Sequence, residues 1–343
     1  MPRSNYAEKL SDHIESTFIE KINLMLLEAQ SSHIDIITKH DGKDYFTIND
    51  FLAQASIMES VYGFDSEMTF LSEEKLTDEI LDVAKYDKRI KCSVDVYKLI
   101  LDSKHDPGKV LHIDPIDGNR VFKNKGRFWS SAVAYQEDGK VKLAMVNEPR
   151  AGRIFKSLEG QPSSVSYGKN HTEILKHPGL YIGEWQLYLV APKVSIDYGD
   201  DEFLPGLNPA ELNKRLKQEF VGADTKRPEK IDFVKPGSGS SSLAYCLMAN
   251  ERYDVGIALF QEPFDVVPGG FILENAGGKV LLSTCDAKTG KIINPELKPY
   301  KERQHEFSEP GKKYHVFAAH SHTTMDVLMN IALAKYEINK PKV

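Results

Sequence analysis

Residues 110–119 read VLHIDPIDGN, an apolar run that ends in two carboxylates, Asp114 and Asp117, three residues apart. Pro115 stiffens the turn between them, and Gly118 allows another backbone or a ligand to approach closely. Carboxylates that converge on one point are the hard oxygen ligands that Mg²⁺ prefers, and Mg²⁺ usually completes its shell with water and substrate phosphate. The stretch therefore predicts a β-strand that ends in a metal site.

Three further acidic segments lie far away in the sequence: Asp50 in TINDF, Glu73-Glu74 in LSEEK and Asp265 in PFDVVPGG. Each has an ordinary structural alternative, because an acidic pair often lies in a solvated loop and an aspartate often caps a helix. MTFLSEE is typical of a strand, however, so Glu73 and Glu74 are expected where ordered backbone stops. Asp50 is expected near the first turn of a helix.

The flanking sequence predicts regular elements on both sides of these motifs. Apolar residues three or four apart predict an amphipathic N-terminal helix with a face made of Ile14, Phe18, Ile22, Leu26 and Ala29. FWSSAVAYQ (128–136) and VKLAMVNEP (141–149), joined through Asp138-Gly139, predict a β-hairpin. Past residue 230, strand and helix patterns alternate, which favours an α/β arrangement.

We therefore expect an α/β fold with two lobes. An α+β lobe over residues 1–170 would carry metal-binding motifs, and an α/β lobe over residues 171–343 would complete the metal and substrate site. An acidic segment rich in Gly and Pro at 196–211 marks a possible lobe boundary, and a helix is expected after it with Asn208 as N-cap. The role of the stretch from 170 to 230 stays open.

Composition excludes several classes of protein. The chain has 343 residues with 44 Lys plus Arg and 50 Asp plus Glu, so its net charge of −6 lacks the basic excess of a general nucleic-acid binder. No apolar run is long enough for a transmembrane helix, and the N-terminus has no apolar region of a secretory signal. Cys92, Cys246 and Cys285 are too scattered to indicate a disulfide framework. We expect a cytoplasmic protein that binds neither a nucleic-acid polymer nor a membrane.

The order of these motifs resembles the inositol monophosphatase superfamily of Mg²⁺-dependent, often lithium-sensitive phosphatases. The matching segments are TKHDGKDYFTIND (38–50), SEE (72–74), DPIDG (114–118), GSGSSS (237–242) and FDVVPGGFILENAGG (264–278). The resemblance implies an αβαβα sandwich of the sugar-phosphatase type with the active site between its lobes. It also implies that metal-activated water hydrolyses a phosphomonoester.

The same resemblance implies a role for each matching residue. Two or three Mg²⁺ ions would be bound by Glu73, Asp114, the carbonyl of Ile116, Asp117 and Asp265. Asp50 and Glu74 would orient water or hold a further, weaker metal. The substrate would bind through its phosphate to the backbone of Gly118 and Asn119, and through its remaining groups to Gly239, Ser240, Ser241 and Glu262.

One position departs from the family pattern. Asn119 stands where the family normally has Thr, sometimes Ser, whose hydroxyl hydrogen-bonds an aspartate matched here by Asp50 and helps to activate water. An Asn amide can hydrogen-bond water but cannot relay a proton in the same way. Asn119 therefore remains among the expected catalytic residues, with an effect on rate more than on metal binding.

Several functions stay open at this stage. The first is hydrolysis of a small phosphorylated metabolite such as an inositol or sugar phosphate, and the alternative is a 3′(2′),5′-bisphosphate nucleotidase. A pseudo-phosphatase that binds metal and a ligand or partner without turnover is a third, supported only by Asn119. A homodimer is a further possibility.

Overall fold

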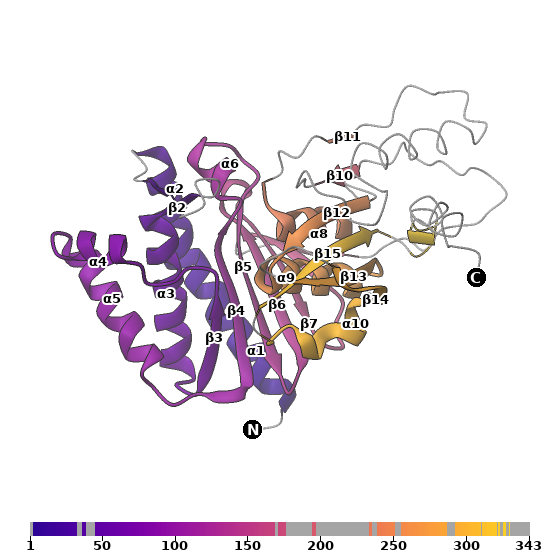
Figure 1. Ribbon diagram of the computed structural model, residues 1–343, viewed down its shortest axis with the longest axis horizontal. Coiled ribbons are helices and arrows are strands. Elements are labelled where there is room, and N and C mark those ends of the chain that lie inside the picture. The colour runs from indigo at the N-terminus through magenta and orange to yellow at the C-terminus, as the bar shows by residue number, and fades with distance from the viewer. Residues whose placement is uncertain are drawn as a thin grey trace.

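The computed structural model describes residues 3–32, 36–38, 45–168, 171–175, 194–196, 233–234, 239–250, 255–286, 292–309 and 311–320, and single positions beyond them. Helices and sheets alternate in layers (Figure 1). N-terminal helices cover one face of a seven-stranded sheet, and α8 (Ser241–Ala249) and α9 (Pro263–Asn275) pack between its other face and a six-stranded sheet. This order of helix, sheet, helix and sheet is the predicted α/β sandwich, and the described residues do not test a fifth layer.

The N-terminal helical segment keeps one apolar face on the sheet by means of a π turn. α1 (Arg3–Thr17), the π segment η1 (Phe18–Ile22) and α2 (Asn23–Ser31) follow one another without a break. Residues four apart drift by about 40° per step around an α-helix, and the wider π turn takes up part of this drift. The predicted apolar row is therefore buried from Ile14 to Leu26, and its last member, Ala29, is half-buried.

The first sheet contains the predicted hairpin. Its strands follow chain order from one edge to the other: β3 (Met68–Ser72), β4 (Asp106–Asp117), β5 (Ser130–Glu137), β6 (Lys140–Glu148), β7 (Arg153–Leu158), β8 (Ser164–Tyr167) and β9 (His171–Ile174). β3 is parallel to β4, and all later neighbours are antiparallel. Asp138 and Gly139 both have positive φ, as a tight hairpin turn whose twist matches the strands requires. β9 continues this sheet just past residue 170, and the division into lobes stays a prediction.

The second sheet comes from the C-terminal part of the chain. Its order is β11 (Phe233–Val234), β10 (Val194–Ile196), β12 (Val255–Gln261), β15 (Lys312–Ala319), β13 (Lys279–Asp286) and β14 (Ile292–Pro299). The predicted strands after residue 230 are β11, β12 and β13. The helix predicted around GGFILENAGG is α9, but it begins at Pro263, six residues earlier, because Glu262 and Asp265 form a capping box at its N-terminus.

The remaining described elements include a third, two-stranded antiparallel sheet, which the first two strands form. They are β1 (Ile36–Thr38), β2 (Tyr45–Thr47), α3 (Ile48–Phe64), α4 (Asp78–Ala84), α5 (Lys88–Leu101), α6 (Asn119–Lys123), η2 (Pro149–Ala151), α10 (Tyr300–Arg303) and η3 (Gln304–Glu306). The possible boundary at 196–211, the helix expected after Asn208 and most of the stretch from 170 to 230 lie outside the described residues.

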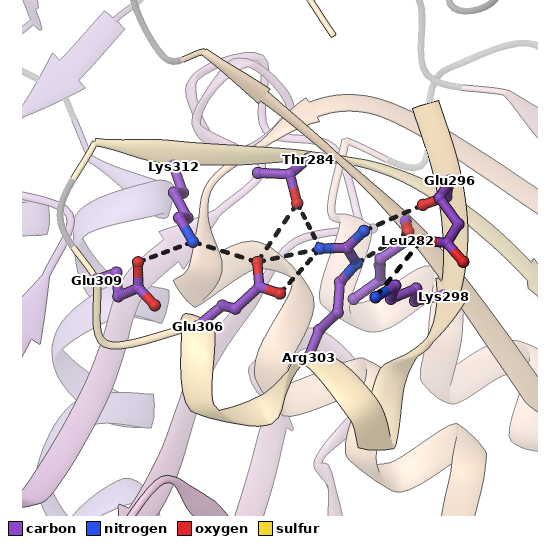
Figure 2. Close-up of polar contacts among 8 residues, drawn as sticks. All are labelled: Leu282, Thr284, Glu296, Lys298, Arg303, Glu306, Glu309 and Lys312. Carbon is purple, nitrogen blue, oxygen red and sulfur yellow. Dashed lines mark hydrogen bonds and ion pairs between the residues drawn. The ribbon is translucent and has the colours of Figure 1, made fainter. Parts of the chain in front are cut away.

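A buried arginine ties α10 to the second sheet (Figure 2). The guanidinium of Arg303 donates to the carbonyl of Leu282 in β13 at 3.2 Å and to the carbonyl of Glu296 in β14 at 3.0 Å. It also bonds the Thr284 hydroxyl at 2.8 Å and the Glu306 carboxylate at 2.9 Å. Arg303 is 2% exposed, so its charge is balanced inside the protein by these acceptors.

Replacing Arg303 by Met should destabilise the protein strongly. The variant keeps an apolar side chain of similar length but leaves two carbonyls and Glu306 without this cation, and breaking a buried ion pair typically costs about 3–5 kcal/mol. The control is Lys298→Met, because the Lys298–Glu296 pair is exposed and such pairs contribute about 0–1 kcal/mol. Urea unfolding of both variants measures the difference, and equal midpoints would contradict the assignment.

Candidate functional site

The two carboxylates of DPIDG face one side because β4 contains one extra residue. Asp114 is opposite Ala132 of β5 and Asp117 is opposite Ser130, so three steps on β4 match two on β5. Residues three apart in a regular strand point to opposite faces, and a bulge of one residue reverses this. Ser131 fixes the irregular backbone, because its hydroxyl donates to the carbonyl of Pro115 at 2.7 Å.

Asp265 joins this pair from α9, a distant part of the chain. One carboxylate oxygen each of Asp114, Asp117 and Asp265 lies within 4.8 Å of the others. Asp265 occupies the first turn of α9, where its side chain accepts the backbone N–H of Glu262 at 2.9 Å. The positive end of the helix dipole favours a carboxylate at this place. The structure therefore brings together three of the predicted metal-binding residues.

Asp117 is held by the N-terminus of α8. It accepts the hydroxyl of Ser240 at 2.8 Å and the backbone N–H groups of Ser241 at 3.1 Å and Ser242 at 2.8 Å. The Ser242 hydroxyl in turn donates to the carbonyl of Asp265 at 2.8 Å. The GSGSSS segment thus orients two metal-binding candidates. Ser240 is buried, and its hydroxyl donates to Asp117. Its predicted contact with substrate stays a prediction.

Burial, together with mutual repulsion, raises the pKa values of the three aspartates in the cluster. Burial is the largest cause at Asp114, and the charges of Glu73, Asp117 and Asp265 add to it, so that its pKa lies well above the usual range. The pKa of Asp265 is raised in the same way. Burial also raises the pKa of Asp117 to about 7, although three hydrogen bonds favour its ionised form. Crowded carboxylates of this kind need a cation to remain ionised together.

The donor set fits a divalent metal of the Mg²⁺ type. Glu73 directly follows β3, and its backbone N–H donates to the carbonyl of Ile113 at 3.1 Å, which places it beside Asp114. Within the described part of the chain, Asp114 Oδ1 is buried and has no hydrogen-bond partner. Ile116 is buried on the same bulged segment of β4. An oxygen-rich site with an unsatisfied carboxylate oxygen is what a hard cation requires.

Two glycines let the DPIDG and GSGSSS segments touch. Gly118 and Gly239 have φ values of +100° and +66°, which other L-residues rarely adopt. A Cβ at Gly118 would lie 2.7 Å from the carbonyl oxygen of Gly239, and a Cβ at Gly239 would lie 2.2 Å from Val121. Both glycines are therefore required for the approach of α6 to α8, whatever substrate contacts they also make.

The predicted water-orienting residues lie on other elements. Asp50 is in the first turn of α3, and its carboxylate accepts the backbone N–H and the hydroxyl of Thr47 at 2.8 and 2.5 Å. Glu74 is buried after β3. Asn119 begins α6, and its amide oxygen is buried without a hydrogen-bond partner among the described residues. These three positions are compatible with the predicted roles but do not test them.

Sequence reasoning missed several residues that support the site. Ser242 belongs to a quoted motif and could have been included, whereas nothing in the sequence marks Ser131 as a partner of Pro115. Glu262, predicted to contact substrate, caps α9 and forms an ion pair of 2.9 Å with Lys313 of β15. Lys313 had no pattern to indicate it, because the pair depends on how β15 lies beside α9.

None of the helices that the structure describes is long and apolar enough to span a bilayer.

No curated protein sequence matches the chain. Solved structures do. An inositol monophosphatase (IMPase) from Thermotoga maritima is 19% identical, with 97% of this chain and all of that chain covered and a TM-score of 0.59. The extragenic suppressor protein SuhB from Bartonella henselae is 15% identical, with 93% and 98% covered and a TM-score of 0.60.

A third structure, an IMPase/NADP phosphatase complexed with Mg²⁺ and phosphate, is 14% identical over 94% of this chain and 95% of its own, with a TM-score of 0.60. At such identities these likenesses establish the fold alone. The sequence profile of the inositol monophosphatase family, however, matches residues 11–309, which include every segment of the carboxylate cluster. The chain therefore belongs to the inositol monophosphatase family, a family of phosphatases.

Proposed function

We propose that this protein is a Mg²⁺-dependent phosphomonoesterase that hydrolyses a small phosphorylated metabolite. The observation that carries the proposal is the cluster of Asp114, Asp117 and Asp265, whose carboxylate oxygens from two distant parts of the chain lie within 4.8 Å of one another. Membership of a phosphatase family supports the reaction class. A relative of the same fold was crystallised with Mg²⁺ and phosphate, which supports the choice of metal.

In this proposal the metal ions are held by Glu73, Asp114, the carbonyl of Ile116, Asp117 and Asp265, and two or three ions are involved. When bound, such ions lower the pKa of water and stabilise negative charge on the phosphoryl group. The chain supplies the geometry. The bulge in β4 aims two carboxylates to one side, and the amides of α8 hold Asp117 in place.

The remaining polar groups would act on water and substrate. Asp50 and Glu74 would orient the attacking water, and Asn119 would contribute a hydrogen bond through its amide. The phosphate would lie against the backbone at Gly118 and Asn119, where α6 begins without a side-chain cap. Gly239, Ser241 and Glu262 would face the rest of the substrate.

Substrate identity separates the alternatives. An inositol or sugar phosphate is the first choice, and a 3′(2′),5′-bisphosphate nucleotide is the second. A pseudo-phosphatase would bind metal without turnover. Because none of the three cysteines, all within described residues, forms a disulfide, we also propose that the protein acts in the cytoplasm. We further propose that the protein forms a homodimer.

The first test is release of phosphate. Wild-type protein with Mg²⁺ should release phosphate from at least one ester in a set of inositol phosphates, sugar phosphates and adenosine 3′,5′-bisphosphate, and EDTA should abolish the release. Asp114→Asn should lose most turnover, because it removes a charged ligand from the cluster. LiCl should slow the reaction relative to equal KCl. Full activity in excess EDTA would refute metal dependence.

The second test measures the charge of the cluster without using activity. Asp265→Asn removes one of several mutually repelling carboxylates, and the Asn oxygen can still accept the N–H of Glu262. In EDTA the variant should therefore melt at a temperature equal to or higher than wild type. Added Mg²⁺ should raise the melting temperature of wild type, as binding to the folded state does, and leave the variant nearly unchanged.

The control for this test is Asp138→Asn in an exposed hairpin turn, which should respond to Mg²⁺ as wild type does. If Mg²⁺ stabilised Asp265→Asn and wild type equally, Asp265 would not be a metal ligand.

The third test concerns Asn119. Replacing it by Thr would restore the hydroxyl that the family normally has at this position. The hydroxyl would act on water in the transition state rather than on bound substrate, so kcat should rise, by about tenfold, with little change in KM. A lower kcat would mean that the site depends on the amide and that Asp50 or Glu74 acts on water directly. The pH–rate profiles of wild type and Asn119→Thr separate these cases, because a changed base moves the acidic limb. The same acidic limb in both profiles would exclude a changed base.

A further inference from the structure

Gln54 connects α3, which carries Asp50, to the Glu73-Glu74 segment that follows β3. It lies four residues after Asp50, so both side chains project from the same face of α3, and neither is exposed. The Gln54 amide nitrogen donates to the carbonyl of Glu74 at 2.7 Å, and the backbone N–H of Glu74 donates to the Gln54 amide oxygen at 2.9 Å. One side chain thus satisfies both backbone groups of Glu74.

This pair of bonds continues the sheet where β3 stops. β3 ends at Ser72. Beyond it, the backbone N–H of Glu73 still donates to the carbonyl of Ile113 in β4. At the next residue the Gln54 amide takes the place of a neighbouring strand, because it donates and accepts as an antiparallel partner does. The hydroxyl of Tyr97 makes a longer contact, 3.4 Å, with the carbonyl of Glu74.

The consequence reaches the carboxylate cluster. Glu73 is held on one side by β4 and on the other by the fixed backbone of Glu74, and its carboxylate is close enough to hydrogen-bond Asp114 and raise that residue's pKa. Without the amide, Glu74 would lose the two bonds that fix its backbone N–H and its carbonyl, and the contact of Tyr97 with that carbonyl is longer. Metal ligands need their backbone fixed to within about 0.5 Å for full affinity.

We propose that Gln54 is a positioning residue, which fixes the Glu73-Glu74 segment so that Glu73 meets the metal together with Asp114. The inference rests on the proposed metal-dependent function and deepens it. Gln54 is not itself a ligand, because its amide oxygen and nitrogen are both occupied by the backbone of Glu74. This role requires the polar atoms of the amide. A methionine at position 54 would have a similar length but could neither donate nor accept these two hydrogen bonds.

The decisive experiment measures Mg²⁺ binding to full-length Gln54→Met by calorimetry. The affinity should fall by about 10–100-fold, which is the usual effect of removing a group that orients a metal ligand. In assays with the phosphate ester that wild type hydrolyses fastest, the Mg²⁺ concentration that gives half of the maximal rate should rise by a similar factor. At saturating Mg²⁺ the KM for that ester should stay near the wild-type value.

The matched control is Met58→Ala. Met58 lies one turn further along α3, is fully buried and packs in the apolar core, so the change lowers the melting temperature without touching Glu74. It should leave the Mg²⁺ affinity unchanged. A second variant, Gln54→Glu, keeps the acceptor for the N–H of Glu74 but, when ionised, has no donor for its carbonyl, so it should also lose Mg²⁺ affinity.

Two outcomes would overturn the inference. If Gln54→Met binds Mg²⁺ like wild type while its melting temperature falls as in Met58→Ala, Gln54 only stabilises the fold. The same conclusion follows if Gln54→Glu, folded at the wild-type melting temperature, keeps full affinity. If wild type binds Mg²⁺, Gln54→Met binds it weakly and no ester is hydrolysed by either, the proposed activity fails but the positioning role stands.

Discussion

Repulsion among buried carboxylates is the constraint on which the rest of this structure depends. Asp114, Asp117 and Asp265 share a space less than 5 Å across with Glu73 beside them. No apolar packing favours such a cluster, so the fold must hold it with groups of opposite polarity. It does so with backbone N–H groups, because α8 and α9 both direct their N-termini at the cluster. The positions of α8 and α9 are therefore those that bring backbone N–H groups to the buried carboxylates.

The close approach of the helices explains the glycines of the motifs. A Cβ at Gly269 in α9 would lie 2.5 Å from the carbonyl oxygen of Ser242 in α8, so only glycine permits this crossing. Gly118 and Gly239 do the same for the contact between α6 and α8. The crossing brings Ser242 to both Asp117 and the carbonyl of Asp265. Small residues in the sequence thus determine how near two charged side chains can come.

Much of the fold could be predicted from the sequence because its signals are local. The hairpin around Asp138-Gly139 and the apolar row of the N-terminal helices depend on neighbours a few residues away. The hairpin is confirmed, and so is the row from Ile14 to Leu26. The bulge in β4 could not be predicted, because it is a relation between two strands. The early start of α9 was missed because the apolar pattern outweighed the capping residues Glu262 and Asp265.

The candidate site divides in the same way. The acidic motifs point to the candidate metal ligands, because the order and spacing of these motifs are visible in the sequence. The residues that aim those ligands carry no such pattern. Gln54 and Ser131 are polar side chains in otherwise apolar segments, and each becomes meaningful only when it is seen to bond a backbone group of a motif. Both are buried, and because burying an unpaired amide or hydroxyl is costly, each needs a partner that only the folded structure identifies.

The carboxylate cluster and the residues proposed to act on water lie on different elements. The cluster is built by β4, α8 and α9, whereas Asp50 belongs to α3 and Asn119 to the first residue of α6. None of the hydrogen bonds that hold Asp117 or Asp265 among the described residues involves Asn119. A change from Thr to Asn at that position therefore leaves the described metal cluster intact. Asp50 keeps a hydroxyl partner in Thr47, whose side chain donates to its carboxylate. If the proposed function holds, we expect this departure from the family pattern to act on the rate of the reaction rather than on the affinity for metal.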